Sequence, residues 1–256
     1  MEKRPVIGLN VSLAHEGDTL KIHAPLSYAE AIARAGGLPL FVPSVEDFSL
    51  IPELVRHLDG AIFIGGKDYL PSHYGGADQF PEELVHPLKD RFDFAWGKYI
   101  MQRTSLPVLG ICGGMQLMAL IQGGTLIQDI ERDWTLHPPL PHNEENRAYR
   151  HLVSVEEGSL LAKIIGNGEG FIFSTNSHHH QAVHPQKTGI DLYPVAKTED
   201  GIVEAIAPTL DSPWAKEERF LIGVQWHPER LWEEERHRLL FIRLVEAALA
   251  FRQSRS

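Results

Sequence analysis

The sequence predicts an α/β fold in which a mostly parallel sheet is covered by helices on both faces. Two observations support this prediction. Short apolar runs alternate with helix-forming runs through the first half of the chain, which is typical of βαβ units. At residues 107–116 an apolar run leads directly into a cysteine and two glycines, and a further helix-forming run follows.

Strands and helices succeed one another regularly in the first half. The first helix has apolar residues at helical spacing and ends at Gly36 and Gly37. The next helix is expected to be interrupted near Pro52, and Pro87 falls inside the third. We expect strands at residues 5–11, 38–42, 60–64 and 108–111, and helices at residues 25–35, 45–58 and 82–101.

The pattern changes after Gly123 and Gly124. Residues 131–150 are rich in proline, histidine and charge, so a surface loop is expected there. The chain shows no internal repeat, low-complexity tract or linker, which predicts a single domain over residues 1–256. Expected strands are residues 125–130, 151–155, 170–174, 191–197, 201–207 and 220–225, and an amphipathic helix is expected at residues 232–251.

Composition excludes several classes of protein. A net charge of −10 without a basic stripe argues against nucleic-acid binding. No apolar run approaches the roughly 20 residues of a membrane span, and the N-terminus lacks the pattern of a signal peptide. The single cysteine excludes an internal disulfide and suits the reducing cytoplasm. We therefore expect a cytoplasmic protein with no membrane or nucleic-acid partner.

Cys112 follows an apolar strand and precedes Gly113, Gly114 and a helix. This order is that of a nucleophile elbow, where a strained turn requires small neighbours and the next helix directs its N-terminus at the nucleophile. The helix N-terminus favours a thiolate there. A lone cysteine is more often an inert buried residue, but its position between strand and helix favours a reactive one.

His227 and Glu229 are the best candidates for the partners of a cysteine nucleophile. His227 follows an apolar strand, so it is expected at the same sheet edge as Cys112. Pro228 should hold an extended backbone in which residues two apart project to the same side, placing Glu229 beside the imidazole. The alternative is a surface His-Pro turn in front of a helix.

Gly65 and Gly66 end another predicted strand. Glycines at this position let the backbone approach a ligand and expose amide N–H groups. An oxyanion would then lie between the amide of Gly66, or of Gly65, and the amide of Gly113. An ordinary βα turn would have much the same sequence.

Four histidines in one short stretch raise the question of a metal site. His178, His179 and His180 are consecutive and His184 is close by. Consecutive residues of a strand alternate sides, and no cysteine or suitably spaced carboxylate completes a site. We therefore predict no metal and expect one of them, His179, to line the pocket.

The segment PVLGICGGMQLMALIQGGTLIQDI resembles the nucleophile segment of class I glutamine amidotransferase-like proteins. Within them the chain is most similar to the gamma-glutamyl-gamma-aminobutyrate hydrolases, a cysteine-peptidase-like family. The segments IGGKDYLPSHYGG, NSHHHQAV and GVQWHPE agree, in the right order and over nearly the whole chain. The resemblance implies a flavodoxin-like three-layer sandwich with extra antiparallel strands in the C-terminal half.

Site roles follow from the resemblance residue by residue. It implies a triad of Cys112, His227 and Glu229, an oxyanion hole at Gly66 and Gly113, and substrate contacts from Gln116. Many members of the hydrolase family carry arginine where this chain has Gly113, which leaves the exact substrate open.

The function implied by the resemblance is hydrolysis of the gamma-glutamyl amide of a small amine, as in polyamine catabolism, without a metal or organic cofactor. Gamma-glutamyl-gamma-aminobutyrate is one such substrate. The alternatives are a glutaminase subunit that supplies ammonia to a synthetase partner, and a binding protein with a dead site. Specificity is expected in the loops at residues 69–79 and 131–150. Homodimers occur among proteins of this resemblance, but no motif here requires one.

Overall fold

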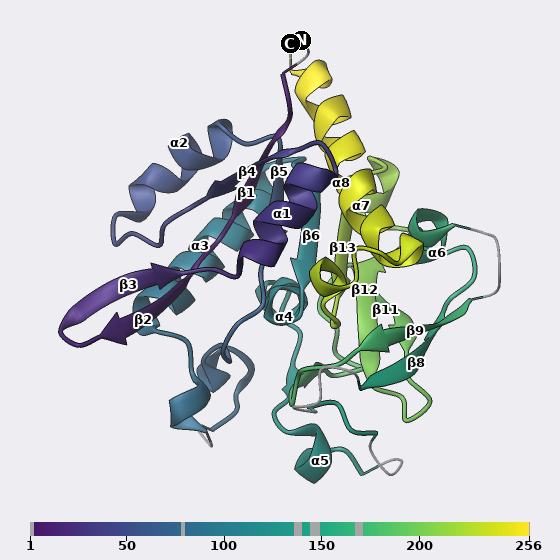
Figure 1. Cartoon of the computed structure of the whole chain (residues 1–256). Helices are drawn as coiled ribbons and strands as arrows, with labels where there is room; N and C mark the ends of the chain where they lie inside the picture. The colour runs from purple at the N-terminus through teal and green to yellow at the C-terminus, as the bar shows by residue number, and fades with distance from the viewer. Residues whose placement is uncertain (1–2, 78–79, 136–139, 144–148, 167–170, 256) are drawn as a thin grey trace.

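A computed structural model describes residues 3–77, 80–135, 140–143, 149–166 and 171–255 (Figure 1). Its largest feature is a nine-stranded sheet with the order β4-β1-β5-β6-β13-β12-β11-β8-β9. The first five strands of this order pair in parallel. They are β4 (Leu38–Phe41), β1 (Val6–Leu9), β5 (Gly60–Phe63), β6 (Val108–Ile111) and β13 (Leu221–Val224).

The other four strands pair antiparallel, each with its neighbours. They are β12 (Val203–Pro208), β11 (Leu192–Lys197), β8 (Arg150–Val155) and β9 (Ile172–Asn176). The described residues thus confirm the predicted α/β class, with added antiparallel strands in the C-terminal half. Gly170, the first residue of the strand expected at residues 170–174, lies outside the described residues.

Helices pack against both faces of the sheet, so its strands are buried on two sides. Along β5, Ile62 belongs to one buried cluster and Phe63 to the other, as alternation along a strand requires. The first cluster packs under α1 (Leu26–Arg34), α6 (Leu160–Ile165) and α8 (Glu235–Ser254). The second packs under α2 (Ile51–Arg56), α3 (Pro87–Arg103) and α4 (Gly113–Ile121).

Several predicted boundaries are wrong for local reasons. The third helix begins at Pro87 and not at residue 82, since proline suits the first helical turn and residues Pro81–Glu83 form a separate 3-10 turn. The helix expected at residues 45–58 is divided into a 3-10 turn, Phe48–Leu50, and α2. The strand expected at residues 125–130 shortens to β7 (Leu126–Ile127), which pairs with β10 (Ala182–Val183) in a small sheet of its own.

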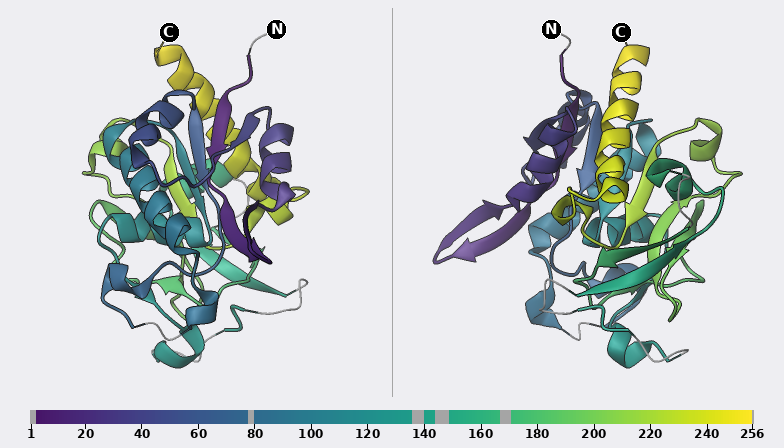
Figure 2. Two further views of the ribbon diagram at one scale, coloured as in Figure 1. Left: turned by 90° about the vertical axis from the view of Figure 1, so that its left-hand side faces the viewer. Right: turned by 45° about the vertical axis from the view of Figure 1, so that its right-hand side comes forward.

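Several elements were not expected from the sequence, α6 and β10 among them. α5 (Ile130–Asp133) lies in the predicted loop, and α7 (Pro213–Lys216) precedes β13. A hairpin of β2 (Ser12–Glu16) and β3 (Thr19–His23) projects from the body of the molecule, as Figure 2 shows. Among the helices described, none is both long and apolar enough to cross a membrane.

Candidate active site

Cys112 stands at a strained turn between β6 and α4. Its backbone has φ 54° and ψ −115°, a conformation that L-residues rarely adopt. The glycine two residues later is required sterically, because a Cβ on Gly114 would lie 1.9 Å from the carbonyl oxygen of Phe63. On the strand side, a Cβ on Gly110 would lie 2.5 Å from the sulfur of Met118. The residue types of the elbow therefore follow from close packing of strand and helix.

The Cys112 thiol is mostly enclosed but opens into a pocket, with 7% of the residue exposed. Gln225 Nε2 lies 3.6 Å from the sulfur and donates a hydrogen bond to it. Gly65 fills the space between Cys112 and His227: a Cβ there would lie 3.0 Å from Cys112 Cβ and 3.4 Å from His227 Cε1. The fold thus brings thiol and imidazole together across a glycine.

His227 is fixed on two sides. Its Nδ1 is 2.8 Å from Glu229 Oε1, the distance of a charge-assisted hydrogen bond. Asn176 holds its backbone, because its side chain accepts from the His227 amide at 2.8 Å and donates to the His227 carbonyl at 3.0 Å. The expected extended backbone after His227 is wrong: residues Pro228–Arg230 form a 3-10 turn, which still brings Glu229 under the ring.

The charge on His227 is governed by its neighbours. Burial, the largest influence, lowers the pKa of the imidazole, but the charges of Glu229 and Cys112 outweigh it and raise that pKa to about 9. Since Nδ1 faces Glu229, Nε2 is the nitrogen left for the thiol side. At neutral pH the pair is therefore an imidazolium beside the cysteine, suited to a thiolate nucleophile and an acid.

Tyr28 is a buried neighbour of His227. Its hydroxyl lies 3.4 Å from His227 Nδ1 and 3.4 Å from the amide nitrogen of Gly65. Burial and the charges of Glu229 and Cys112 raise the pKa of the phenol well above its usual value, so it stays neutral. Tyr28 thus positions the imidazole without competing for its proton.

The two glycines proposed for an oxyanion hole are neighbours in space. A Cβ on Gly113 would lie 3.5 Å from the amide nitrogen of Gly66 and 3.6 Å from Gly65 Cα. The Gly66 end of β5 and the first residue of α4 therefore face each other beside Cys112. These contacts are ordinary van der Waals distances, so the space at position 113 also admits a Cβ.

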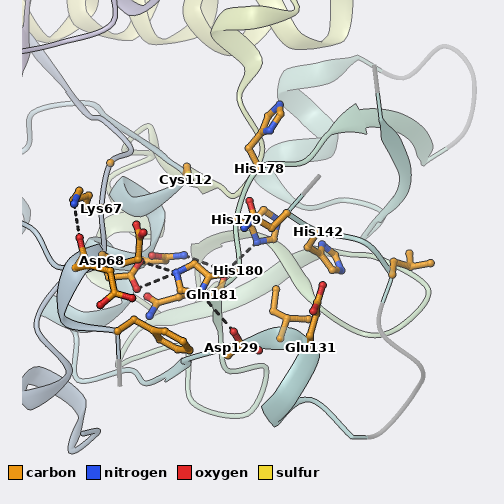
Figure 3. A pocket seen from close by; sticks show the side chains of 18 residues that line it. Lys67, Asp68, Cys112, Asp129, Glu131, His142, His178, His179, His180 and Gln181 are labelled. Atoms are coloured by element: carbon orange, nitrogen blue, oxygen red, sulfur yellow. Dashed lines mark hydrogen bonds and ion pairs between the residues drawn. The ribbon is translucent and has the colours of Figure 1, made fainter. Parts of the chain in front are cut away.

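A pocket of about 530 Å³ opens in front of Cys112 (Figure 3). Gly66 and Gln116 line it, as does the segment from His178 to Gln181. Gln116 Nε2 donates to the Gln181 carbonyl and to Gln225 Oε1, at 3.3 and 3.2 Å. Five carboxylates line the same pocket, against one lysine, Lys67, among the described lining residues: Asp68, Glu82, Glu83, Asp129 and Glu131.

A second buried carboxylate–histidine group forms part of the pocket wall. Glu204 is fully buried on β12, and its Oε1 lies 3.4 Å from His179 Nε2, 3.6 Å from His142 Nδ1 and 3.9 Å from His151 Nε2. Burial raises the pKa of Glu204. The surrounding histidines, His179 first, lower this pKa by a larger amount, so the net shift is downward. His142, His179 and Glu204 are close enough together to share a metal ion.

Four of the seven site residues predicted from the sequence line one pocket: Gly66, Cys112, Gln116 and His179. The other three, Gly113, His227 and Glu229, lie next to Cys112 or, for Glu229, against His227. Two site residues were missed. Gln225 precedes His227 by two positions, so the same spacing argument that selected Glu229 would have found it. Tyr28 comes from a distant helix and has no local signal.

Comparison with known protein families shows to which family the chain belongs. The Peptidase C26 family model matches residues 5–229. The chain belongs to the Peptidase C26 family. A glutamine amidotransferase-like protein of Rickettsia prowazekii is 32% identical, covering 97% of this chain and 99% of its own. A protein of Mycobacterium tuberculosis that is named for a resemblance to glutamine amidotransferases is 31% identical, over 99% of this chain and 78% of its own.

A solved structure with the same fold supports the architecture. A GMP synthase subunit from Thermoplasma acidophilum superposes with a TM-score of 0.64 at 17% identity, over 100% of this chain and 99% of that one. The predicted resemblance to glutamine amidotransferase-like proteins is confirmed at the level of the family. Family membership supports the class of cysteine-type amide hydrolases and amidotransferases.

Proposed function

We propose that this chain hydrolyses the gamma-glutamyl amide bond of small gamma-glutamylated amines, with Cys112 as nucleophile, His227 as acid and base, and Glu229 as the group that orients His227. The observation that supports this most is the strained Cys112 beside an imidazole that Glu229 holds at 2.8 Å. The proposal includes a flavodoxin-like layering, a single domain and a place in cytoplasmic amine catabolism.

In the first half-reaction the Cys112 thiolate attacks the delta-carbonyl carbon and a C–S bond forms. The amides of Gly66 and Gly113 donate to the oxyanion of the tetrahedral intermediate. Protonated His227 gives its Nε2 proton to the amine nitrogen as the C–N bond breaks. The products of this step are the free amine and a gamma-glutamyl thioester.

In the second half-reaction neutral His227 accepts a proton from water, and the resulting hydroxide attacks the thioester. The C–S bond breaks and releases glutamate, and the thiolate is regenerated beside the protonated imidazole. No step needs a metal or an organic cofactor.

The charge of the pocket favours one class of leaving amine. Its five carboxylates outnumber Lys67, whose ammonium donates to the Glu82 carbonyl oxygen, and His180, which pairs with Asp68 and Asp129. A second ammonium group on the amine, as in gamma-glutamyl-putrescine, would be attracted by this wall. The carboxylate of gamma-aminobutyrate would be repelled. We therefore expect gamma-glutamylated diamines to be better substrates than gamma-glutamyl-gamma-aminobutyrate.

The second candidate is a glutaminase subunit that passes ammonia to a synthetase partner. The names of the relatives favour it, since both are described as glutamine amidotransferases or as similar to them. The same thiol chemistry would serve both functions, so the site alone does not distinguish them. The two functions differ in the leaving group, which is an amine for the hydrolase and ammonia for the glutaminase.

The test measures the release of glutamate and of ammonia from a panel of substrates. The panel contains gamma-glutamyl-putrescine, gamma-glutamyl-gamma-aminobutyrate and glutamine, each with the wild type and Cys112→Ala. Turnover of a gamma-glutamyl amine that is lost in Cys112→Ala supports the hydrolase. Ammonia release from glutamine alone would favour the amidotransferase.

A further inference from the structure

Glu204 is a buried charge that the described residues leave without a hydrogen bond. It is fully buried, and neither carboxylate oxygen has a hydrogen-bond donor among the described residues. A carboxylate in such a place costs several kcal/mol unless a cation compensates it. The group that faces it consists of three buried histidines: His142, His151 and His179.

The contacts on the far sides of two of these rings fix their tautomers. His179 Nδ1 is 2.9 Å from the carbonyl oxygen of Gln181, which only accepts, so this nitrogen carries a hydrogen. His142 Nε2 is 3.1 Å from a carboxylate oxygen of Asp200 and donates to it in the same way. In the neutral rings, the remaining nitrogens therefore present lone pairs to the Glu204 carboxylate.

Lone pairs that face a carboxylate require a cation between them, either a proton or a metal ion. A proton would draw nitrogen and oxygen to about 2.8 Å, as it does between His227 and Glu229. The distances at Glu204 are 3.4 and 3.6 Å. Bonds of about 2.1 Å in a tetrahedral arrangement place ligand atoms roughly 3.4 Å apart. The separations thus match a shared metal ion.

We propose that Glu204 Oε1, His142 Nδ1 and His179 Nε2 bind a divalent transition-metal ion of the zinc class, with His151 packed beside these three ligands. His151 is buried, its Nε2 is 3.9 Å from the same oxygen, and neither ring nitrogen has a hydrogen-bond partner among the described residues. Imidazole and carboxylate ligands in a four-coordinate set are typical of zinc.

The outer contacts strengthen this assignment. Histidines that bind zinc commonly donate their other N–H to a carboxylate or a backbone carbonyl. His142 does so to Asp200 and His179 to the Gln181 carbonyl. Asp200 is itself held, by the amide of Leu140 at 2.8 Å and by the Thr198 hydroxyl.

The ion would hold the pocket wall together. Its ligands come from β12 and from the segments that contain His142 and His179, and those two residues line the pocket in front of Cys112. Its role is structural: it fixes the segment from His178 to Gln181 in place, and the proposed hydrolysis does not pass through it. The site is therefore independent of the proposed function.

The first test measures metal by elemental analysis of protein produced without a histidine tag. It uses Cys112→Ala, so that the thiol cannot bind the ion. After equilibration with Zn²⁺ and removal of free ion, we expect about one zinc per chain. A content well below this overturns the proposal.

The second test compares variants. Glu204→Gln, which is close to isosteric, should weaken Zn²⁺ binding by roughly 10- to 100-fold or more. His184→Ala, a neighbouring histidine outside the group, should leave it unchanged. Unaltered affinity in Glu204→Gln, or equal loss in His184→Ala, would contradict the assignment.

The third test remains informative if Glu204→Gln fails to fold. Co²⁺ bound to Cys112→Ala should give the intense visible absorption of a tetrahedral ion, without a thiolate charge-transfer band. The weak spectrum of an octahedral ion would overturn the site.

Discussion

The structure contains two buried carboxylate–histidine groups, which differ in distance and in origin. His227 and Glu229 are two residues apart and 2.8 Å from each other. Glu204 lies 3.4 to 3.9 Å from its histidines, which are distant in the chain. The first distance fits a shared proton, and the second set fits a shared metal ion. Under the two proposals, the same residue types serve acid–base chemistry in one group and structure in the other.

The difference also shows how each group is assembled. The first is local, since a strand end and a turn bring its members together after β13. The second exists only because β8 and β12 lie in one sheet, separated by β11, with two further segments packed against them. A local group can be predicted from spacing, whereas the other depends on strand order.

The comparison is tested most strongly by Glu229→Gln, which keeps the shape of the side chain and removes its charge. We expect kcat/KM to fall by about 10³- to 10⁴-fold, as for other triads. Burial lowers the pKa of His227 and the charges of Glu229 and Cys112 raise it to about 9. Without Glu229 the alkaline limb of the pH profile should therefore move from near this value to lower pH.

The matched control for this variant is Glu204→Gln in zinc-loaded protein. It should leave the alkaline limb in place even if it lowers stability, because the pKa of His227 depends on Glu229 and Cys112. An identical shift of the pH profile in both variants would show that the two groups do not have separate roles.

A smaller effect is expected from the glycines of the elbow. Gly114→Ala should destabilise the fold by about 1–3 kcal/mol or more, since its Cβ would lie 1.9 Å from a backbone oxygen. Gly113→Ala should change stability by less than about 1 kcal/mol, because its nearest contact would be 3.5 Å. Urea unfolding of the two variants measures this difference, and equal losses would contradict the described packing.

The smallest effect concerns the acidic wall of the pocket. Glu82 and Glu131 are exposed, so their charges are screened by solvent. In the double variant Glu82→Gln/Glu131→Gln, KM for gamma-glutamyl-putrescine should rise about 2- to 5-fold at low salt. KM for gamma-glutamyl-gamma-aminobutyrate should not rise. Equal changes for both substrates would remove charge as the basis of selectivity.

How much the sequence predicts depends on how local each feature is. The Cys112 elbow is visible because steric demands fix glycine on both sides of one turn. The order of the antiparallel strands β12, β11, β8 and β9 is set by long-range pairing, which no local pattern encodes. For that reason Glu204 was not connected with His179. The β2–β3 hairpin was overlooked although Gly17, with φ 61°, marks its turn.

The central claim is that Cys112 carries a gamma-glutamyl thioester. Its most direct test is to mix the wild type with a gamma-glutamyl amide, quench in acid within the first turnovers and map peptides by mass spectrometry. We predict a glutamyl adduct on the peptide that contains Cys112, absent in Cys112→Ala, which should lose at least about 10³-fold in activity. Continued turnover by Cys112→Ala, with no adduct on the wild type, would contradict the account.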